Sequence, residues 1–306
     1  MTVPRLLIIE APSSAVSDPA TADDVLAALR AITDTAASFD GVVVGLPEIA
    51  VDAAAAIDPA VAAGLLSAGG PRSFVVSADT GRHAPFNLAR RVQTLARITG
   101  GRIGLHVRST GIDPLTRASG TVPATADPIE AFAEYLAVLS RLWRSFPDDA
   151  LVGDRDSGIL ADPSQLAPAD FTGRVYAVAG ALNVPLDPAL RPVVIVDRAD
   201  AVALARRDVE SEAAPFDAVL TDVDDELADE FGVAVLKRLV WSPASATATD
   251  AAQLIGAVDA DGVVLRIDAP LAQVAGALED LLAATGREPA DDDDAPLRAL
   301  REVAVR

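Results

Sequence analysis

The chain has 306 residues, of which 51% are hydrophobic and only 4% aromatic, and its formal net charge is −20. This length fits one barrel or two small domains. An acidic surface repels nucleic acid phosphates and anionic lipids, so we discount both as partners. Cysteine is absent, which excludes disulfides, thiolate metal sites and cysteine nucleophiles.

The amino-terminal segment is a short apolar run that meets Pro12. It lacks the longer apolar region and the cleavage site of a signal peptide. No apolar run approaches the roughly 20 residues that a membrane helix needs. We therefore expect a soluble cytoplasmic protein.

The first third of the chain alternates short apolar runs with helical patterns. The runs predict strands over residues 6–9, 41–44, 74–77 and 103–107. The patterns predict helices over residues 22–37, 59–67 and 88–98. Thr21 is the expected N-cap of the first helix, and the Gly100–Gly101 pair ends the third.

The alternation then breaks and resumes. Residues 109–127 form a polar stretch, 128–146 an amphipathic helix, and 147–189 a largely irregular region with a hairpin around 173–179. Strands are then predicted over 192–196, 218–220, 234–240 and 262–267. The helices predicted between and after these strands cover 201–207, 224–231, 249–257 and 271–284.

Eight apolar strands, each followed by a helix, favour a parallel sheet closed into a (β/α)8 TIM barrel. The alternative is a split α/β chain in which residues 147–190 are a linker. We expect one barrel over residues 1–286. Residues 287–306, which include the acidic run 291–294, are expected to form a solvated C-terminal tail.

Three stretches resemble a known family. They are PFNLARRVQTLARITGGRIGLHV (85–107), EYLAVLSRLWRSFPDDALVGDRD (134–156) and FTGRVYAVAGALNVP (171–185). In order and spacing they are similar to the bacterial luciferase-like flavin monooxygenases, and nearest to the branch of nitrilotriacetate monooxygenase component A. The resemblance covers roughly residues 75–196. It implies a luciferase-like barrel in which residues 109–190 carry a family insertion between strands four and five.

The resemblance also implies an activity. Such enzymes bind reduced flavin mononucleotide (FMN) at the C-terminal mouth of the barrel and oxygenate a small organic substrate through a flavin peroxide. A separate flavin reductase supplies the reduced cofactor, and a deazaflavin is an alternative cofactor. Members often form homodimers or heterodimers through the helices beside strands two and three, which here are residues 51–66 and 85–98.

Five residues at or after strand ends are candidates for contacts with the flavin, and all except Ser77 match residues of the family. Ser77 and Thr80 can hydrogen-bond the ring, or they can satisfy nearby backbone groups. His106 falls on a family asparagine, and it is the candidate catalytic residue because histidine carries protons near neutral pH. Its alternative is a packed histidine of the barrel. Ser109 and Thr110 can contact the cofactor or begin the loop.

Other positions depart from the family. Leu46 replaces an aspartate after strand two, and residues 111–125 lack the histidine and tyrosine that help to hold the flavin phosphate. After strand five, VDRADAVALAR lacks the glycines and serines of the family's phosphate turn, and Asp197 and Asp200 add negative charge. Arg198 is the remaining candidate for phosphate binding. These losses support a second hypothesis, a degenerate barrel that serves as a partner subunit or a binding protein.

The remaining charged residues of interest have simpler interpretations. We expect His83 and Arg82 to form an exposed loop pair, and the alternative is that they meet an anionic ligand. The two histidines have no acidic pair nearby, so we expect no metal site. Arg90 and Arg91 are expected to form salt bridges on an acidic protein.

Overall fold

The computed structural model describes residues 6–12, 21–50, 56–70, 72–110, 127–207, 216–225, 231–288 and 296–303. Eight parallel strands close into a barrel, and β1 pairs with both β2 and β12. The closed barrel confirms the predicted (β/α)8 class and rules out the split chain. Around the barrel the strands are β1 (Leu6–Glu10), β12 (Gly262–Ile267), β11 (Ala234–Trp241), β10 (Ala218–Asp222), β9 (Val193–Asp197), β6 (Ile103–Arg108), β5 (Phe74–Asp79) and β2 (Val42–Leu46).

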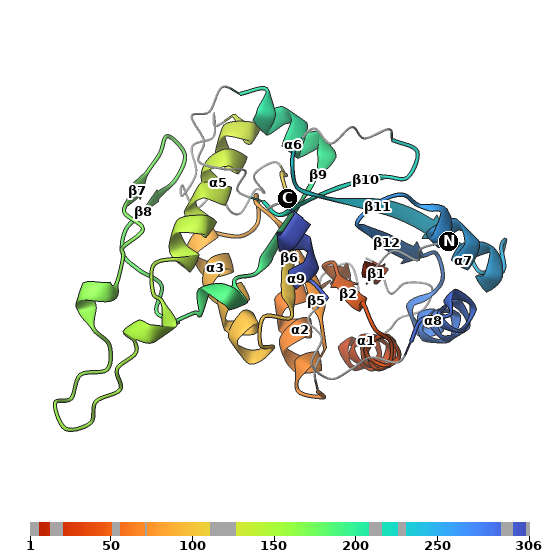
Figure 1. The fold of residues 1–306 in the computed structure, drawn as a ribbon, viewed down its shortest axis with the longest axis horizontal. Helices are drawn as coiled ribbons and strands as arrows, with labels where there is room; N and C mark the ends of the chain where they lie inside the picture. Colours follow the sequence, from red (N-terminus) through yellow and green to blue (C-terminus); the bar gives the residue numbers. More distant parts are fainter. Residues whose placement is uncertain are drawn as a thin grey trace.

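Helices pack around the outside of the barrel (Figure 1). They are α1 (Ala22–Ala37), α2 (Pro59–Ser67), α3 (Pro85–Ile98), α5 (Pro128–Trp143), α6 (Arg198–Ala205), α7 (Ala248–Ala257) and α8 (Leu271–Thr285). Thr21 caps α1 in a capping box with Asp24, as predicted. Most of the helix expected over 224–231 lies outside the described residues, and its described ends, Asp224 and Phe231, are not helical. No described helix is long and apolar enough to cross a membrane.

The core has two parts because each strand buries both of its faces. One part lies between the strands and the outer helices, where Leu46 is fully buried. The other fills the inside of the barrel with small aliphatic side chains. Gly104 leaves room for the side chain of Val75 in that interior, since a Cβ at residue 104 would come within 3.1 Å of it.

The C-terminal segment closes one end of the barrel. Leu297 and Leu300 are buried and belong to the inner part of the core, and helix α9 (Arg298–Val303) contacts β9 and β11. Figure 1 shows α9 across the middle of the barrel. The expectation of a solvated tail is therefore wrong for residues 297–303. The acidic run 291–294 lies outside the described residues.

The long connection from β6 to β9 carries α5 and then an extended arm (left in Figure 1). The arm contains the predicted hairpin, formed by β7 (Phe171–Thr172) and β8 (Ala177–Val178). It also contains the short 3-10 helices η1 (Asp148–Ala150), η2 (Pro163–Gln165) and η3 (Pro188–Leu190). A two-stranded ribbon of β3 (Ile49–Ala50) and β4 (Ala56–Ile57) follows β2.

Candidate functional site

The C-terminal ends of the barrel strands carry charged residues that face the barrel interior. Side chains alternate along a strand, so the residues that follow the apolar inner core at intervals of two also face inward. On β5 the inward series is Val75, Ser77 and Asp79, and on β6 it ends at His106 and Arg108. The mouth cluster, as we name it, consists of Glu10, Asp79, Arg108, Asp197, Asp222 and Arg238.

Arg238 is the central cation of this cluster. Its guanidinium nitrogens lie 3.4 Å from Asp197 Oδ1, 3.7 Å from Asp222 Oδ1 and 3.9 Å from Glu10 Oε2. A second pair joins Arg108 to Asp79 at 2.9 Å, and these two residues are also register partners on adjacent strands. The mouth therefore holds both signs of charge in a network of short distances.

His106 lies below this network and is 8% exposed. Its Nε2 is 3.3 Å from Asp197 Oδ1, but the two groups are not aligned as a hydrogen bond. Ser77 is its register partner on β5. Burial raises the pKa of Asp197. The opposing effect of His106, Arg238 and Arg108 is larger, so the pKa of this carboxyl lies below its usual value. Asp197 is thus an anion at neutral pH.

The amino terminus of α6 opens onto the same mouth. Asp197 is the N-cap residue of α6 without a capping hydrogen bond, and Arg198 is its first residue. Asp200, in the first turn, accepts a hydrogen bond of 3.0 Å from the backbone N–H of Ser109. Burial raises the pKa of Asp200, and the charge of Asp197 raises it further. Two carboxylates therefore occupy a helix end that ordinarily attracts anions.

The structure brings the predicted residues Ser77, Thr80, His106, Ser109 and Thr110 to the ends of β5 and β6, with Arg198 at the start of α6. Thr80 and Thr110 are engaged with backbone. Thr80 Oγ1 accepts from the N–H of Thr110 at 3.5 Å, and Thr110 Oγ1 accepts from that of Gly81 at 3.3 Å. The positions missed from the sequence are the charged strand ends: Glu10, Asp79, Arg108, Asp222 and Arg238. Each stands two residues after an inward-facing residue, but the sequence alone does not show that the strand continues to it.

His83 belongs to a separate cluster at the start of α3. Its Nδ1 is 3.1 Å from a guanidinium nitrogen of Arg91, which also pairs with Asp58 at 2.7 Å, so the predicted salt bridge of Arg91 is confirmed. Burial lowers the pKa of His83, and the charge of Arg91 lowers it further. Arginine can only donate, so Nδ1 accepts and the ring is neutral. No group of metal-binding side chains occurs in the part of the chain that the structure describes.

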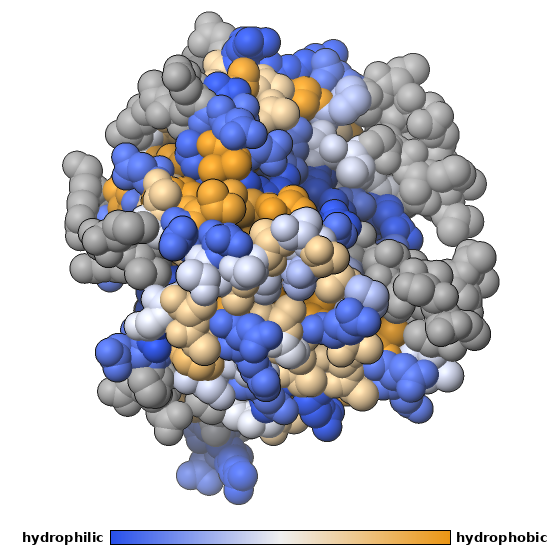
Figure 2. Space-filling model, turned by 90° about the vertical axis from the view of Figure 1, so that its right-hand side faces the viewer, coloured by the Kyte–Doolittle hydropathy of each residue, from blue (hydrophilic) through white to orange (hydrophobic). Residues whose placement is uncertain are grey.

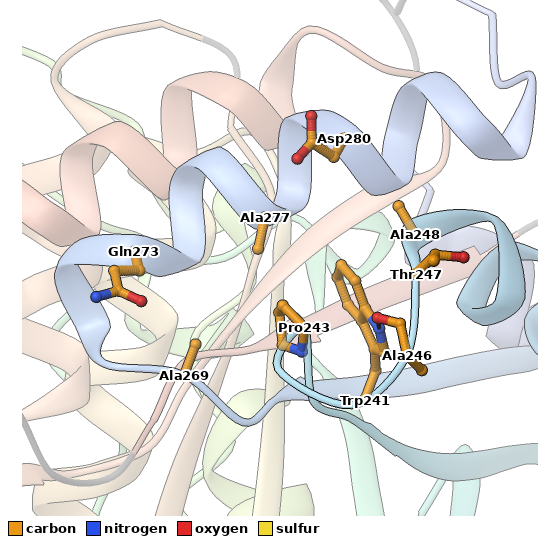
Figure 3. A pocket seen from close by; sticks show the side chains of 9 residues that line it. All are labelled: Trp241, Pro243, Ala246, Thr247, Ala248, Ala269, Gln273, Ala277 and Asp280. Carbon is orange, nitrogen blue, oxygen red and sulfur yellow. Dashed lines mark hydrogen bonds between the residues drawn. The ribbon is translucent and has the colours of Figure 1, made fainter.

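A hollow of about 380 Å³ lies away from the mouth, between α8 and the loop from β11 to α7 (Figure 3). Trp241, Pro243 and residues 246–248 face Gln273, Ala277 and Asp280 of α8 across it (Figure 3). Trp241 is held by a hydrogen bond from Nε1 to the carbonyl of Ala246. Figure 2 shows the side of the molecule that holds α7 and α8, where hydrophobic patches lie among hydrophilic residues. The hollow carries no second charged side chain, so the mouth is the better candidate site.

Comparison with known proteins identifies relatives of this barrel. The family model described as luciferase-like monooxygenase matches residues 13–210. The chain is 31% identical over 115 residues to dibenzothiophene-sulfone monooxygenase of Rhodococcus erythropolis, which covers 37% of this chain and 25% of that protein. It is 29% identical over 127 residues to nitrilotriacetate monooxygenase component A of Aminobacter aminovorans, or 40% of this chain and 27% of that one. The match thus spans about a quarter of the length of these relatives.

Solved structures share the fold over nearly the whole chain. EDTA monooxygenase from Chelativorans superposes with a TM-score of 0.69, covering 99% of this chain and 98% of that one at 18% identity. An F420-dependent secondary alcohol dehydrogenase superposes with a TM-score of 0.59 at 12% identity, over 93% of this chain and 99% of that one.

Proposed function

Because this chain belongs to the luciferase-like monooxygenase family, we propose that it oxygenates a small organic substrate with a reduced flavin that a separate reductase supplies. The observation that carries the proposal is the position of Ser77 and His106. They are neighbours on β5 and β6 and face the barrel interior near its C-terminal mouth, where active sites of this fold are built. Reduced FMN is the cofactor that the family resemblance implies, and a deazaflavin is the alternative.

The described residues fit the ring of a flavin better than its phosphate. His106 Nε2 is buried, and its contact with Asp197 Oδ1 at 3.3 Å is not aligned as a hydrogen bond, so the atom can take a better-aligned polar partner. A flavin ring presents polar atoms of that kind along one edge. At the start of α6, in contrast, Asp197 and Asp200 stand where a phosphate would need donors.

Reduced flavin, when bound, supplies the electrons with which oxygen is activated. The chain positions the substrate and moves protons. The charged carboxylate of Asp197, 3.3 Å away, orients the imidazole of His106. That ring can give or take a proton at Nε2. Ser77, beside it in the sheet, can hydrogen-bond the same ligand.

Anaerobic titration of the protein with reduced FMN and with reduced deazaflavin tests the proposal. We expect saturable binding, and oxygen consumption coupled to product when a flavin reductase, NADH and a sulfide or sulfone are added. His106→Asn restores the family's residue, so it should hold flavin within about threefold of the wild type. His106→Leu should weaken binding about tenfold, because it removes a buried hydrogen bond.

His83→Asn is the matched control, since the other histidine lies in a separate cluster, and it should bind flavin as the wild type does. Equal binding by wild type and His106→Leu would show that His106 does not contact the ligand. Absence of binding at high micromolar flavin would sink the proposal.

The mouth cluster favours one other function, a barrel without flavin that acts as a partner subunit or a binding protein. Its ion pairs join each charge of the mouth cluster to an opposite charge without any ligand. This candidate predicts no flavin binding and co-purification with a protein of similar size. Oxygenation by the isolated chain with a reductase would exclude it.

We also propose that the chain pairs through α2 and α3, as the resemblance implies. Val61 and Leu65 on α2 are 53% and 50% exposed, and Ile98 at the end of α3 is 62% exposed. Residues 51–55 of the predicted surface lie outside the described residues. Val61→Glu with Leu65→Glu should turn a dimer into a monomer in light-scattering measurements. Leu254→Glu on α7, an equally exposed leucine, should not.

A further inference from the structure

The amino terminus of α6 sits directly at the barrel mouth, because β9 ends at Asp197 and α6 begins at Arg198. A helix start in this position ordinarily offers unpaired backbone N–H groups and the positive end of the helix dipole to an anion. Such a helix start can bind a phosphate. The question is what ligand group this particular helix start accepts.

The protein's own carboxylates fill that place. Asp200 takes the backbone N–H of Ser109 at 3.0 Å, which removes one donor of the loop that follows β6. Asp197 stands at the N-cap and is held as an anion by His106, Arg238 and Arg108. Arg198 brings one positive charge against these two negative ones. A phosphate at this helix start would be repelled by two carboxylates. One backbone donor, the N–H of Ser109, would already be taken by Asp200.

The cations of the mouth are already engaged. Arg238 lies within 3.9 Å of Asp197, Asp222 and Glu10, and Arg108 lies 2.9 Å from Asp79. A phosphate would have to share either guanidinium with the carboxylates already paired to it. The negative charges of those carboxylates would repel the phosphate at short range.

Two polar side chains near the start of α6 are less firmly engaged than the arginines. His106 is 8% exposed, and its Nε2 lies 3.3 Å from Asp197 Oδ1 without an aligned hydrogen bond. Ser77 is its register partner and faces the same interior. The mouth therefore offers polar contacts to a neutral ring while it opposes a dianion at the adjoining helix start.

We infer that the mouth selects a flavin without a phosphate, of the riboflavin class, over FMN. This inference rests on the proposed function, because it concerns the same site. It reverses the charge preference that a helix start at a barrel mouth ordinarily has. Its cause is the pair of carboxylates at Asp197 and Asp200.

Equilibrium dialysis of the full chain against reduced riboflavin and reduced FMN, without oxygen, tests the inference. We expect riboflavin to bind about tenfold more tightly at low ionic strength, since a phosphate of about two negative charges faces two carboxylates at short range. The preference should narrow as salt is raised from about 0.05 M to about 0.5 M, because salt screens exposed charges.

Asp200→Asn identifies the cause. An asparagine oxygen can still accept from Ser109 N–H, so the loop keeps its anchor while one negative charge is lost. The preference for riboflavin should fall about threefold. Asp261→Asn is the matched control, because Asp261 also accepts a backbone N–H, that of Val235, at the opposite end of the barrel. It should leave the preference unchanged.

The outcomes separate the two proposals. Equal binding of the two flavins, or tighter binding of FMN, would overturn the inference and leave the proposed function standing. A riboflavin preference that Asp200→Asn does not reduce would overturn the electrostatic cause. If neither flavin binds, both the inference and the proposed function fail.

Discussion

Arg238 joins three carboxylates that come from three different strands. Glu10, Asp197 and Asp222 all lie within 3.9 Å of its guanidinium nitrogens. Residues with such partners respond to pH through their neighbours as well as through burial. Asp197 and Asp200, three residues apart, illustrate this because their pKa values move in opposite directions.

Asp197 stabilises the fold at neutral pH. Its folded-state pKa lies below the unfolded value, so its contribution is present above a pH of about 3.9 and is lost as the pH falls through the folded-state pKa. Asp197→Asn should lower the free energy of unfolding by about 1 kcal/mol at pH 7, and the deficit should vanish in strong acid. Urea unfolding between pH 2 and about 7 measures both. A deficit that persists unchanged at the lowest pH would contradict this assignment.

The pKa of Asp200 is shifted in the opposite direction to that of Asp197. Its pKa is raised in the folded state, so its contribution to stability is present at low pH and is lost as the pH rises through the folded-state value. Asp200→Asn should therefore be slightly more stable than the wild type at pH 7 and equal to it below a pH of about 3.9. The same urea series measures this. Destabilisation at neutral pH would mean that the charged carboxylate is needed for the bond to Ser109.

The site was only partly predictable from its residues. Ser77 and His106 stood out because they end apolar runs. Asp79 and Arg108 did not, since a charge after an apolar run is typical of a loop. Here the strands continue past the apolar run into the mouth, and only closure of the barrel shows that these charges face inward.

At the scale of elements, apolar runs locate strands well when both faces are buried. All eight predicted barrel strands form, and β5 and β9 extend beyond the apolar run to Asp79 and Asp197. The last helix was missed because Leu297 and Leu300 are two isolated apolar residues after an acidic run, and nothing local indicates that a barrel end will cover them.

One side chain of α5 binds three backbone groups of the β7–β8 hairpin. The carboxylate of Glu134 accepts the backbone N–H groups of Arg174, Val175 and Tyr176 at 2.6 to 2.9 Å. Gly173 permits this close approach, because a Cβ there would overlap the carboxylate. Glu134 thus satisfies three donors of one turn.

Glu134→Ala should release this hairpin. Three backbone donors lose a charged acceptor, which should cost about 2 to 3 kcal/mol locally. Hydrogen exchange at residues 174–176 should become about thirtyfold faster or more. Glu130→Ala is the control, because Glu130 pairs only with Arg174, whose side chain is 84% exposed, and its loss should change little. Unchanged protection in Glu134→Ala would show that the hairpin is held by its apolar contacts.

At the scale of the molecule, the barrel has a charged mouth and an apolar base. Leu300, 1% exposed, packs with Leu297 into the inner core at the base. Leu300→Ala should lower the free energy of unfolding by about 2 to 4 kcal/mol in urea, as for other buried leucines. Arg298→Ala, which removes one long hydrogen bond to Gly100, should cost less than about 1 kcal/mol. Equal losses for the two variants would argue against burial of the leucine as the cause.

The pairing of β1 with β12 has a consequence for synthesis. Leu6 is the register partner of Gly262, so the barrel closes only when residues some 256 positions apart along the chain meet. Until then β1 and β12 each have an open edge, of the kind that pairs with other chains. Contacts between such distant residues form slowly. A ribosome making this chain therefore carries an unclosed sheet for most of translation, and its protection from aggregation must come from outside the barrel.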